Sequence, residues 1–179
     1  MIKRVLASLL CTAALAGLAV PARAMDRDSV FFHSVEGQWS GPGEIVAGKY
    51  QGTKFNCTFS GTSPENASGM TLGGSCHVGI FSQEMKASVV RTGGRYKGKF
   101  QVNGDGIDIV TGDVQGSRVV LALAYKELNG AMFARLADHD TMHVTISVKV
   151  QDQMVPVIGM NLKRVDAHAT GSIKAASNQ

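Results

Sequence analysis

The sequence predicts an all-β protein, a single antiparallel up-and-down β-barrel of about 8 to 10 strands with a short helical turn at its start. Apolar and polar residues alternate from Gly37 onward, and turn-forming residues interrupt this alternation about every 8 to 12 residues. No segment keeps a helical period for more than about two turns. With 179 residues, of which 44% are hydrophobic and 18% charged, the chain suits one domain with a hydrophobic core.

A closed barrel is favoured over a two-sheet sandwich. Many short antiparallel strands in one unit have to hide their edges, and both architectures do this. The short, evenly spaced turns favour a meander, because the Greek-key connections of a sandwich need longer crossovers. The apolar faces also carry small residues, so a barrel interior need not be packed solid; these residues include Ala87, Gly98, Ala122 and Ala124.

Residues 1–24 are expected to be a cleaved signal peptide. Lys3 and Arg4 precede an uncharged apolar run, and the segment ends in Ala-Arg-Ala, which places small residues where signal peptidase requires them. The apolar run is too short to span a bilayer comfortably, so no transmembrane segment is expected in the mature chain. We therefore expect a periplasmic protein whose barrel domain covers residues 25–165.

An alternative for the same segment is a lipoprotein signal, in which Cys11 would carry the lipid. Leu10 precedes it at a position where a small residue is required, and the apolar run continues well beyond it. Cleavage after residue 24 would remove Cys11 altogether, so the two alternatives exclude each other.

Removal of residues 1–24 brings the protein close to neutrality. Three basic residues leave with the segment, which reduces the 18 basic residues to 15 against 14 acidic ones, a net charge of +1. The densest basic patch, around Lys97 and Lys99, alternates with apolar residues and glycine, as the outer face of a strand does. Because a nucleic-acid binder needs a clustered basic surface, no nucleic-acid partner is expected.

The secondary-structure elements follow from the N-terminal side. A short helical turn is expected over Asp26–Val35, with Asp26 or Asp28 as its N-cap. The earlier strands place on their apolar faces Phe55, Cys57, Phe59, Tyr96, Phe100, Val102, Val119, Leu121, Leu123 and Tyr125. The clearest strand, Thr141–Val150, has an apolar face made of Met142, Val144, Ile146, Val148 and Val150. The next run is expected to place on one side Met154, Pro156, Ile158, Met160 and Leu162.

Two asparagine-glycine pairs are expected to form tight hairpin turns. Asn103-Gly104 and Asn129-Gly130 both offer residues that tolerate the positive φ of such turns. Residues 166–179 have no periodicity and are expected to be a flexible C-terminal tail.

Cys57 and Cys76 are predicted to form a structural disulfide. Residues that pair across an antiparallel hairpin have a constant index sum, and this pair places the hairpin centre between Asn66 and Ala67, inside a cluster of turn formers. A cross-strand disulfide there would contribute about 3 kcal/mol by loop-entropy reasoning. A redox or metal-thiolate role would need a C-x-x-C spacing or further ligands, which the sequence around them does not offer.

The first strand carries a resemblance to a known superfamily. Gly37-Gln38-Trp39-Ser40-Gly41-Pro42-Gly43 resembles the G-x-W start of lipocalin and calycin barrels, and its Gly-x-Trp-x-Gly-x-Gly form is similar to bacterial nitrobindin-like barrels. The resemblance implies that a basic residue of the last strand, here Arg164, packs over Trp39 and closes the barrel. It also implies ligand binding, by analogy alone. No counterpart of a nitrobindin haem ligand is found in this sequence.

No motif for catalysis or cofactor binding is found. The sequence lacks a nucleophile elbow, a zinc-protease helix motif, a P-loop and a dinucleotide fingerprint. The polar cluster over residues 138–143 contains His139 and His143, but it is expected to be a turn entering a strand and not a ligand-bearing helix. We therefore expect no catalytic residues, no metal and no cofactor.

The function predicted from these observations is the binding of a small hydrophobic or amphipathic molecule, such as a lipid, by a non-enzymatic periplasmic barrel. The ligand is expected to lie among Phe55, Phe59, Phe100, Met142, Ile158 and Met160. The alternative is a filled barrel that acts through its outer surface on an envelope protein, as an envelope-maintenance factor or an inhibitor. An enzyme is the least favoured reading, because no nucleophile has a base at a recognisable spacing.

Overall fold

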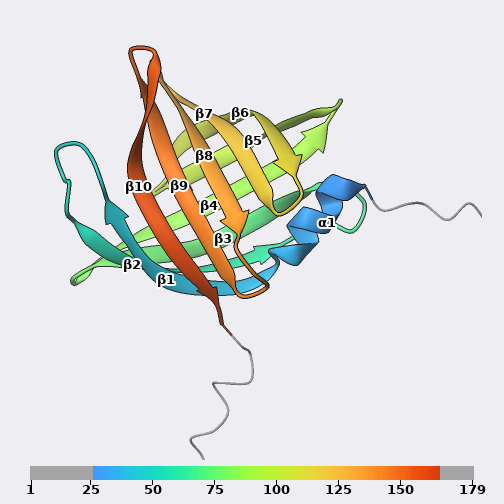
Figure 1. Ribbon diagram of the computed structural model, residues 1–179, viewed down its shortest axis with the longest axis horizontal. Helices are drawn as coiled ribbons and strands as arrows, with labels where there is room; N and C mark the ends of the chain where they lie inside the picture. The colour runs from blue at the N-terminus through green and yellow to red at the C-terminus, as the bar shows by residue number, and fades with distance from the viewer. Residues whose placement is uncertain (1–25, 166–179) are drawn as a thin grey trace, which may run out of the picture.

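The computed structural model describes residues 26–165, which form a closed antiparallel β-barrel with a short helix against one end (Figure 1). The predicted signal peptide and the predicted tail lie outside the described residues. The elements are α1 (Arg27–Ser34), β1 (Gly37–Ile45), β2 (Lys54–Thr62), β3 (Gly69–Val78), β4 (Phe81–Thr92), β5 (Arg95–Val102), β6 (Asp105–Gln115), β7 (Arg118–Tyr125), β8 (Leu128–Leu136), β9 (Thr141–Val150) and β10 (Gln153–Arg164). The predicted all-β up-and-down barrel is confirmed.

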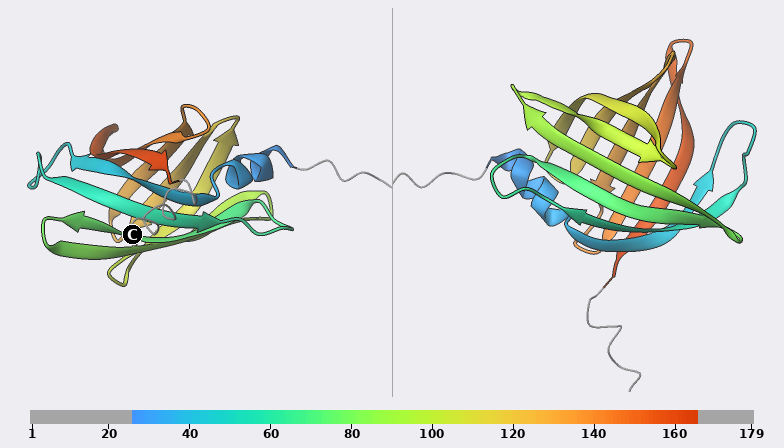
Figure 2. Two further views of the ribbon diagram at one scale, coloured as in Figure 1. Left: turned by 90° about the horizontal axis from the view of Figure 1, so that it is seen from below. Right: turned by 180° about the vertical axis from the view of Figure 1, so that it is seen from behind.

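The barrel closes where its first strand pairs with its last. Every other pairing joins strands that follow one another in the chain, whereas β1 and β10 pair with Trp39 opposite Arg164 and Gly43 opposite Met160. Closure leaves no sheet edge to be covered, and the two views of Figure 2 show the strands wrapping around one interior. Within residues 26–165, no helix has the length and apolar character that crossing a bilayer requires.

A β-bulge in β10 changes which residues face inward. The pairing between β9 and β10 shifts between Pro156 and Ile158, so Ile158 lies opposite inward-facing Ile146 while Pro156 lies opposite outward-facing Ser147. The expectation that Met154 and Pro156 share a face with Ile158 is therefore wrong. One extra residue at the bulge reverses the alternation, and no local pattern marks where such a residue is inserted.

One of the two predicted asparagine-glycine turns is present. Asn103 and Gly104 have φ of 49° and 94° and connect β5 to β6. The turn predicted at Asn129-Gly130 is wrong, because the chain turns at Lys126, with φ of 54°, and both residues lie within β8. Gly130 is needed for a different reason: a Cβ there would lie 2.6 Å from the carbonyl oxygen of Ser147.

Helix α1 closes one end of the barrel. Its apolar residues Phe31 and Phe32 are buried, and the Phe32 ring lies 5.6 Å from that of Tyr96 on β5. Asp26 occupies the N-cap position, but its side chain makes no capping hydrogen bond. It accepts one from Arg91 at 2.7 Å instead, which ties the start of the helix to β4.

Candidate ligand-binding site in the barrel interior

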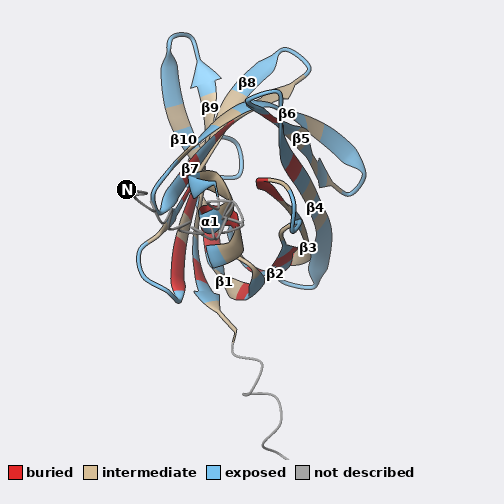
Figure 3. Ribbon diagram, turned by 90° about the vertical axis from the view of Figure 1, so that its right-hand side faces the viewer, coloured by how far each residue is buried: buried red, intermediate tan, exposed pale blue. Residues whose placement is uncertain are grey.

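The half of the interior next to α1 is packed with buried side chains. Figure 3 looks at the barrel from this end and shows buried segments on the strands around the helix. Strand residues of this packed half are Trp39, Phe59, Val89, Tyr96, Ile109, Val119, Leu121, Ala134, Met142, Val144 and Leu162. Phe31, Phe32 and Val35 cover them from the helical side. This half is an ordinary hydrophobic core.

The half of the interior away from α1 is lined by apolar side chains that are only half-buried. The strand register places them on the inner wall; Ala87, for example, lies opposite Leu72 on β3 and Phe100 on β5. The open half is lined by Phe55, Leu72, Met85, Ala87, Phe100, Leu123, Met132, Ile146, Ile158 and Met160. Because inward-facing side chains are shielded from solvent outside the barrel, their partial exposure means that water reaches them from within. Protein atoms therefore do not fill this half.

The predicted ligand-binding residues are divided between the two halves. Phe55, Ile158 and Met160 lie in the open half, together with Phe100 on the opposite wall. Phe59 and Met142 belong to the packed half, where they are 6% and 8% exposed. Sequence reasoning selected residues by their inward parity, and parity does not reveal how far along the barrel axis a residue lies.

Most of the open half was missed as a ligand-binding wall. Met85, Leu123, Met132 and Ile146 complete it, and each lies on a strand face that alternates in the expected way. The alternation was therefore a usable signal. It did not single these residues out, because the same pattern marks the packed half.

Glycines in β1 allow Met160 to cross the wall of the open half. Gly43 lies between Met160 on β10 and Phe55 on β2, and a Cβ at Gly43 would lie 2.8 Å from Met160 Cγ and also meet the Phe55 ring. The Met160 side chain therefore passes over β1 and places its Sδ 4.0 Å from Cys57 Sγ. The Gly-x-Gly part of the first-strand motif thus shapes the interior.

The predicted disulfide between Cys57 and Cys76 is present. The two residues lie directly opposite each other on β2 and β3, with 4.0 Å between their Cα atoms, and both side chains are buried. Met85 Sδ lies 3.6 Å from Cys76 Sγ, on the side away from Met160. Since disulfide sulfurs carry no proton to donate, these sulfur contacts are packing contacts. They make the disulfide part of the inner wall.

Arg164 joins three parts of the chain at the closed end. Its guanidinium lies over the indole of Trp39, 4.3 Å from the ring centroid. The same group donates hydrogen bonds to the carbonyl oxygens of Ser34 and Glu36, just after α1 and before β1. Trp39 Nε1 donates to the Val35 carbonyl at 2.9 Å, so the indole and the guanidinium both hold the linker between helix and barrel.

Two carboxylates fasten α1 and its linker to the sheet. Tyr96 donates a hydrogen bond to Asp28 at 2.7 Å; burial and this bond raise the pKa of Tyr96 well above its ordinary range. Glu36 accepts a hydrogen bond from the Ser63 backbone N–H at 2.8 Å, and this bond holds the pKa of Glu36 below its ordinary value. The closed end is therefore held by polar contacts as well as by packing.

The mouth of the open half carries polar groups. Gln83 lies opposite Cys76 and Asp105 opposite Val102, so both follow inward-facing positions at the outer limit of the lining. Tyr125 has the inward parity of Leu123 on the same strand. An apolar lining that ends in hydrogen-bonding groups fits a molecule with an apolar body and a polar head.

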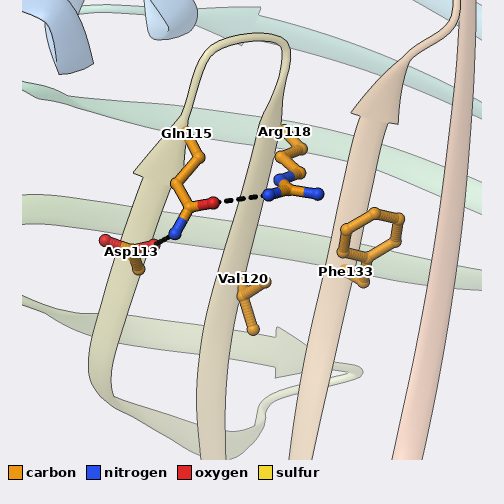
Figure 4. A pocket seen from close by; sticks show the side chains of 5 residues that line it. All are labelled: Asp113, Gln115, Arg118, Val120 and Phe133. Atoms are coloured by element: carbon orange, nitrogen blue, oxygen red, sulfur yellow. Dashed lines mark hydrogen bonds between the residues drawn. The ribbon is translucent and has the colours of Figure 1, made fainter.

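Two hollows lie outside the interior. Figure 4 shows one of about 270 Å³ on the outer face of β6, β7 and β8, where Asp113, Gln115 and Arg118 hydrogen-bond to one another beside Phe133. The second, of about 390 Å³, lies between α1 and the loops around Ser117 and Asp138. In the first, the polar groups already satisfy each other, which leaves little for a ligand to bind.

The polar segment over residues 138–143 does not assemble a metal site. His139 contacts Asp140 at 2.7 Å in the β8–β9 turn, whereas His143 contacts Asn161 at 2.6 Å on the outer face of β9 and β10. Among residues 26–165, no three side chains of the His, Cys, Asp and Glu types are arranged to hold a metal ion.

Comparison with known proteins supports the fold. The structure of Rv2717c from M. tuberculosis is similar with a TM-score of 0.55 at 12% identity, over 80% of this chain and 100% of that one. The S-type phycobiliprotein lyase CPES from Guillardia theta is similar with a TM-score of 0.51 at 17% identity, over 77% of this chain and 92% of that one. No protein-family model matches the sequence, and no curated protein matches it. At these identities the likeness concerns the fold alone, which is calycin-like.

Proposed function

We propose that this protein is an exported, non-enzymatic barrel that binds a small hydrophobic or amphipathic molecule in the open half of its interior. The observation that carries this proposal is the contrast between the two halves of the inner wall. Both are apolar, but only the half next to α1 is packed. An apolar wall in contact with water is unfavourable, and a ligand that replaces that water stabilises the protein.

The shape of the site favours an elongated ligand that enters by one end. Helix α1 and its linker cover the other end, so the ligand's apolar part would lie towards the disulfide and Met160. Its polar part would remain at the mouth near Gln83, Asp105 and Tyr125. Phospholipids, fatty acids and similar amphiphiles share this division into an apolar body and a polar head.

A bulky substitution on the inner wall tests the proposal. Ala87 faces inward in the open half, and Ser88 beside it is exposed on the outer face. N-phenyl-1-naphthylamine is a suitable probe, because its fluorescence rises when it leaves water for an apolar site. We expect the wild type and Ser88→Trp to take up the dye, and Ala87→Trp to bind it at least about tenfold more weakly, because the indole occupies ligand space.

The outcomes separate the proposal from the filled-barrel alternative. Far-UV circular dichroism of all three proteins establishes that each one is folded. No dye uptake by the folded wild type, or equal uptake by Ala87→Trp, would contradict an interior site and favour a protein that acts through its outer surface.

A further inference from the structure

The mouth of the open half is surrounded by exposed apolar side chains. Of the twelve large apolar side chains exposed within residues 26–165, eight lie in or beside the turns at this end of the barrel. Ile80 is 93% exposed and Phe81 71% exposed at the tip of the β3–β4 hairpin, and Tyr50 is 63% exposed in the β1–β2 loop. Figure 1 shows these loops projecting on the side opposite α1. Large apolar side chains this exposed and this clustered mark an interaction surface.

The apolar lining of the interior continues without a break onto this surface. Phe81 lies opposite Val78, which has the inward parity of Cys76 on β3. Leu128 on β8 and Val150 on β9 likewise have the parity of the inward-facing residues of their strands. A molecule leaving the interior would therefore pass from one apolar surface to the next. We call Tyr50, Ile80, Phe81, Leu128 and Val150 the mouth rim.

The side chains next to the mouth rim are of the types found at membrane surfaces. Lys49 Nζ lies 5.4 Å from the centroid of the Tyr50 ring, and Lys126 Nζ lies 5.1 Å from that of Tyr125. Tyrosine and lysine favour the boundary between hydrocarbon and water, because each combines an apolar body with a polar end. The five turns at this end carry two lysines, one glutamate and one aspartate, so they have no net charge. Attraction to anionic lipid is therefore not what this surface offers.

We propose that the mouth rim inserts shallowly into the surface of a phospholipid bilayer, with the open half of the interior facing the hydrocarbon. The apolar residues stand on separate hairpins around an opening. A folded protein partner covering them would seal that opening, whereas acyl chains can fill it. In this position an amphiphile moves between bilayer and barrel without its apolar part crossing water. This exchange rests on the proposed function, but the docking itself does not.

Vesicle flotation tests the docking. The probe is a vesicle of phosphatidylcholine, and the variant is Ile80→Ser with Phe81→Ser, two exposed tip residues on which folding does not depend. Val90→Ser with Val120→Ser is the matched control, since both valines are exposed on the outer wall. We expect the wild type and the control to float equally and the tip variant to bind at least about tenfold more weakly. Binding should persist in about 1 M NaCl, where surface charges are screened.

Other outcomes would overturn the proposal. These are a wild type that does not float, a tip variant that floats like the wild type, and binding that requires anionic lipid and disappears in high salt. A dimer in light scattering that the tip variant abolishes, without vesicle binding, would assign the rim to a second copy of the chain.

Dye uptake from water distinguishes the failure of the docking from the failure of ligand binding. The tip variant should still take up N-phenyl-1-naphthylamine, and Ala87→Trp should still float with vesicles. Flotation without dye uptake in the wild type would contradict the proposed function alone, and dye uptake without flotation would contradict the docking alone.

Discussion

Arg164 is the residue on which the closed end depends most. Its guanidinium stacks on Trp39 and donates to two carbonyl oxygens of the linker after α1. Arg164→Ala removes the stacking and leaves those carbonyls without this donor, so we expect a loss on the order of 2–3 kcal/mol in unfolding free energy. For a domain of this size that lowers the melting temperature by roughly 10 °C, which differential scanning calorimetry would measure.

Two further variants define the role of that residue. Arg164→Lys keeps the charge but not the planar fork, so its melting temperature should lie between those of the wild type and the alanine variant. Arg135→Ala, exposed on the outer face of β8, should change little. If Arg164→Ala leaves both the melting temperature and the Trp39 emission unchanged, the contact does not hold the closed end.

At the scale of elements, the linker after α1 gives the fold an acid-sensitive attachment. The Ser63 N–H holds the pKa of Glu36 below its ordinary value, so the carboxylate stabilises the folded state at neutral pH and this stabilisation is lost as the pH falls through the folded-state pKa. Glu36→Gln should therefore lose less stability than the wild type between about pH 5 and pH 3. Urea denaturation at both pH values measures the difference, and Glu127→Gln, in the exposed β7–β8 turn, should follow the wild type. An equal loss in Glu36→Gln would place the acid sensitivity elsewhere.

The β2–β3 hairpin depends on a covalent link. Cys57 and Cys76 are 19 residues apart, and a loop of that length should stabilise the folded state by about 3 kcal/mol. Replacing both cysteines by alanine should lower the unfolding free energy by about that amount, which urea denaturation would measure. Reduction of the wild type should have a similar effect. If neither treatment changes stability, the disulfide does not constrain the unfolded chain.

At the scale of the whole molecule, export and ligand carriage can be tested on one sample. We expect protein from the periplasmic fraction to have the mass of residues 25–179, without the first 24 residues and without lipid on Cys11. Native mass spectrometry should add to this a reproducible bound mass that solvent extraction removes. A chain that retains residues 1–24 would contradict cleavage, and a mass that shows lipid on Cys11 would establish the lipoprotein alternative.

The sequence was sufficient for the architecture but not for the extent of the site. Local alternation and turn spacing predicted the barrel, and index arithmetic predicted the disulfide, because both depend on residues close in the chain. The face of Met154 and the role of Gly130 depend on the register between strands, which a single bulge changes. The packing of Phe59 depends on where α1 docks, and the alternation contains no information about that docking.

The pairing of β1 with β10 has a consequence for how the chain reaches its final form. The first strand cannot acquire its second partner until the last strand has been synthesised and has arranged itself, so the longest-range contacts of the molecule form late. Until then, β1 and β9 present unpaired backbone groups to any other chain nearby. An exported protein with this topology needs protection during translocation, and its folding rate should be set by how quickly the two chain ends of the domain meet.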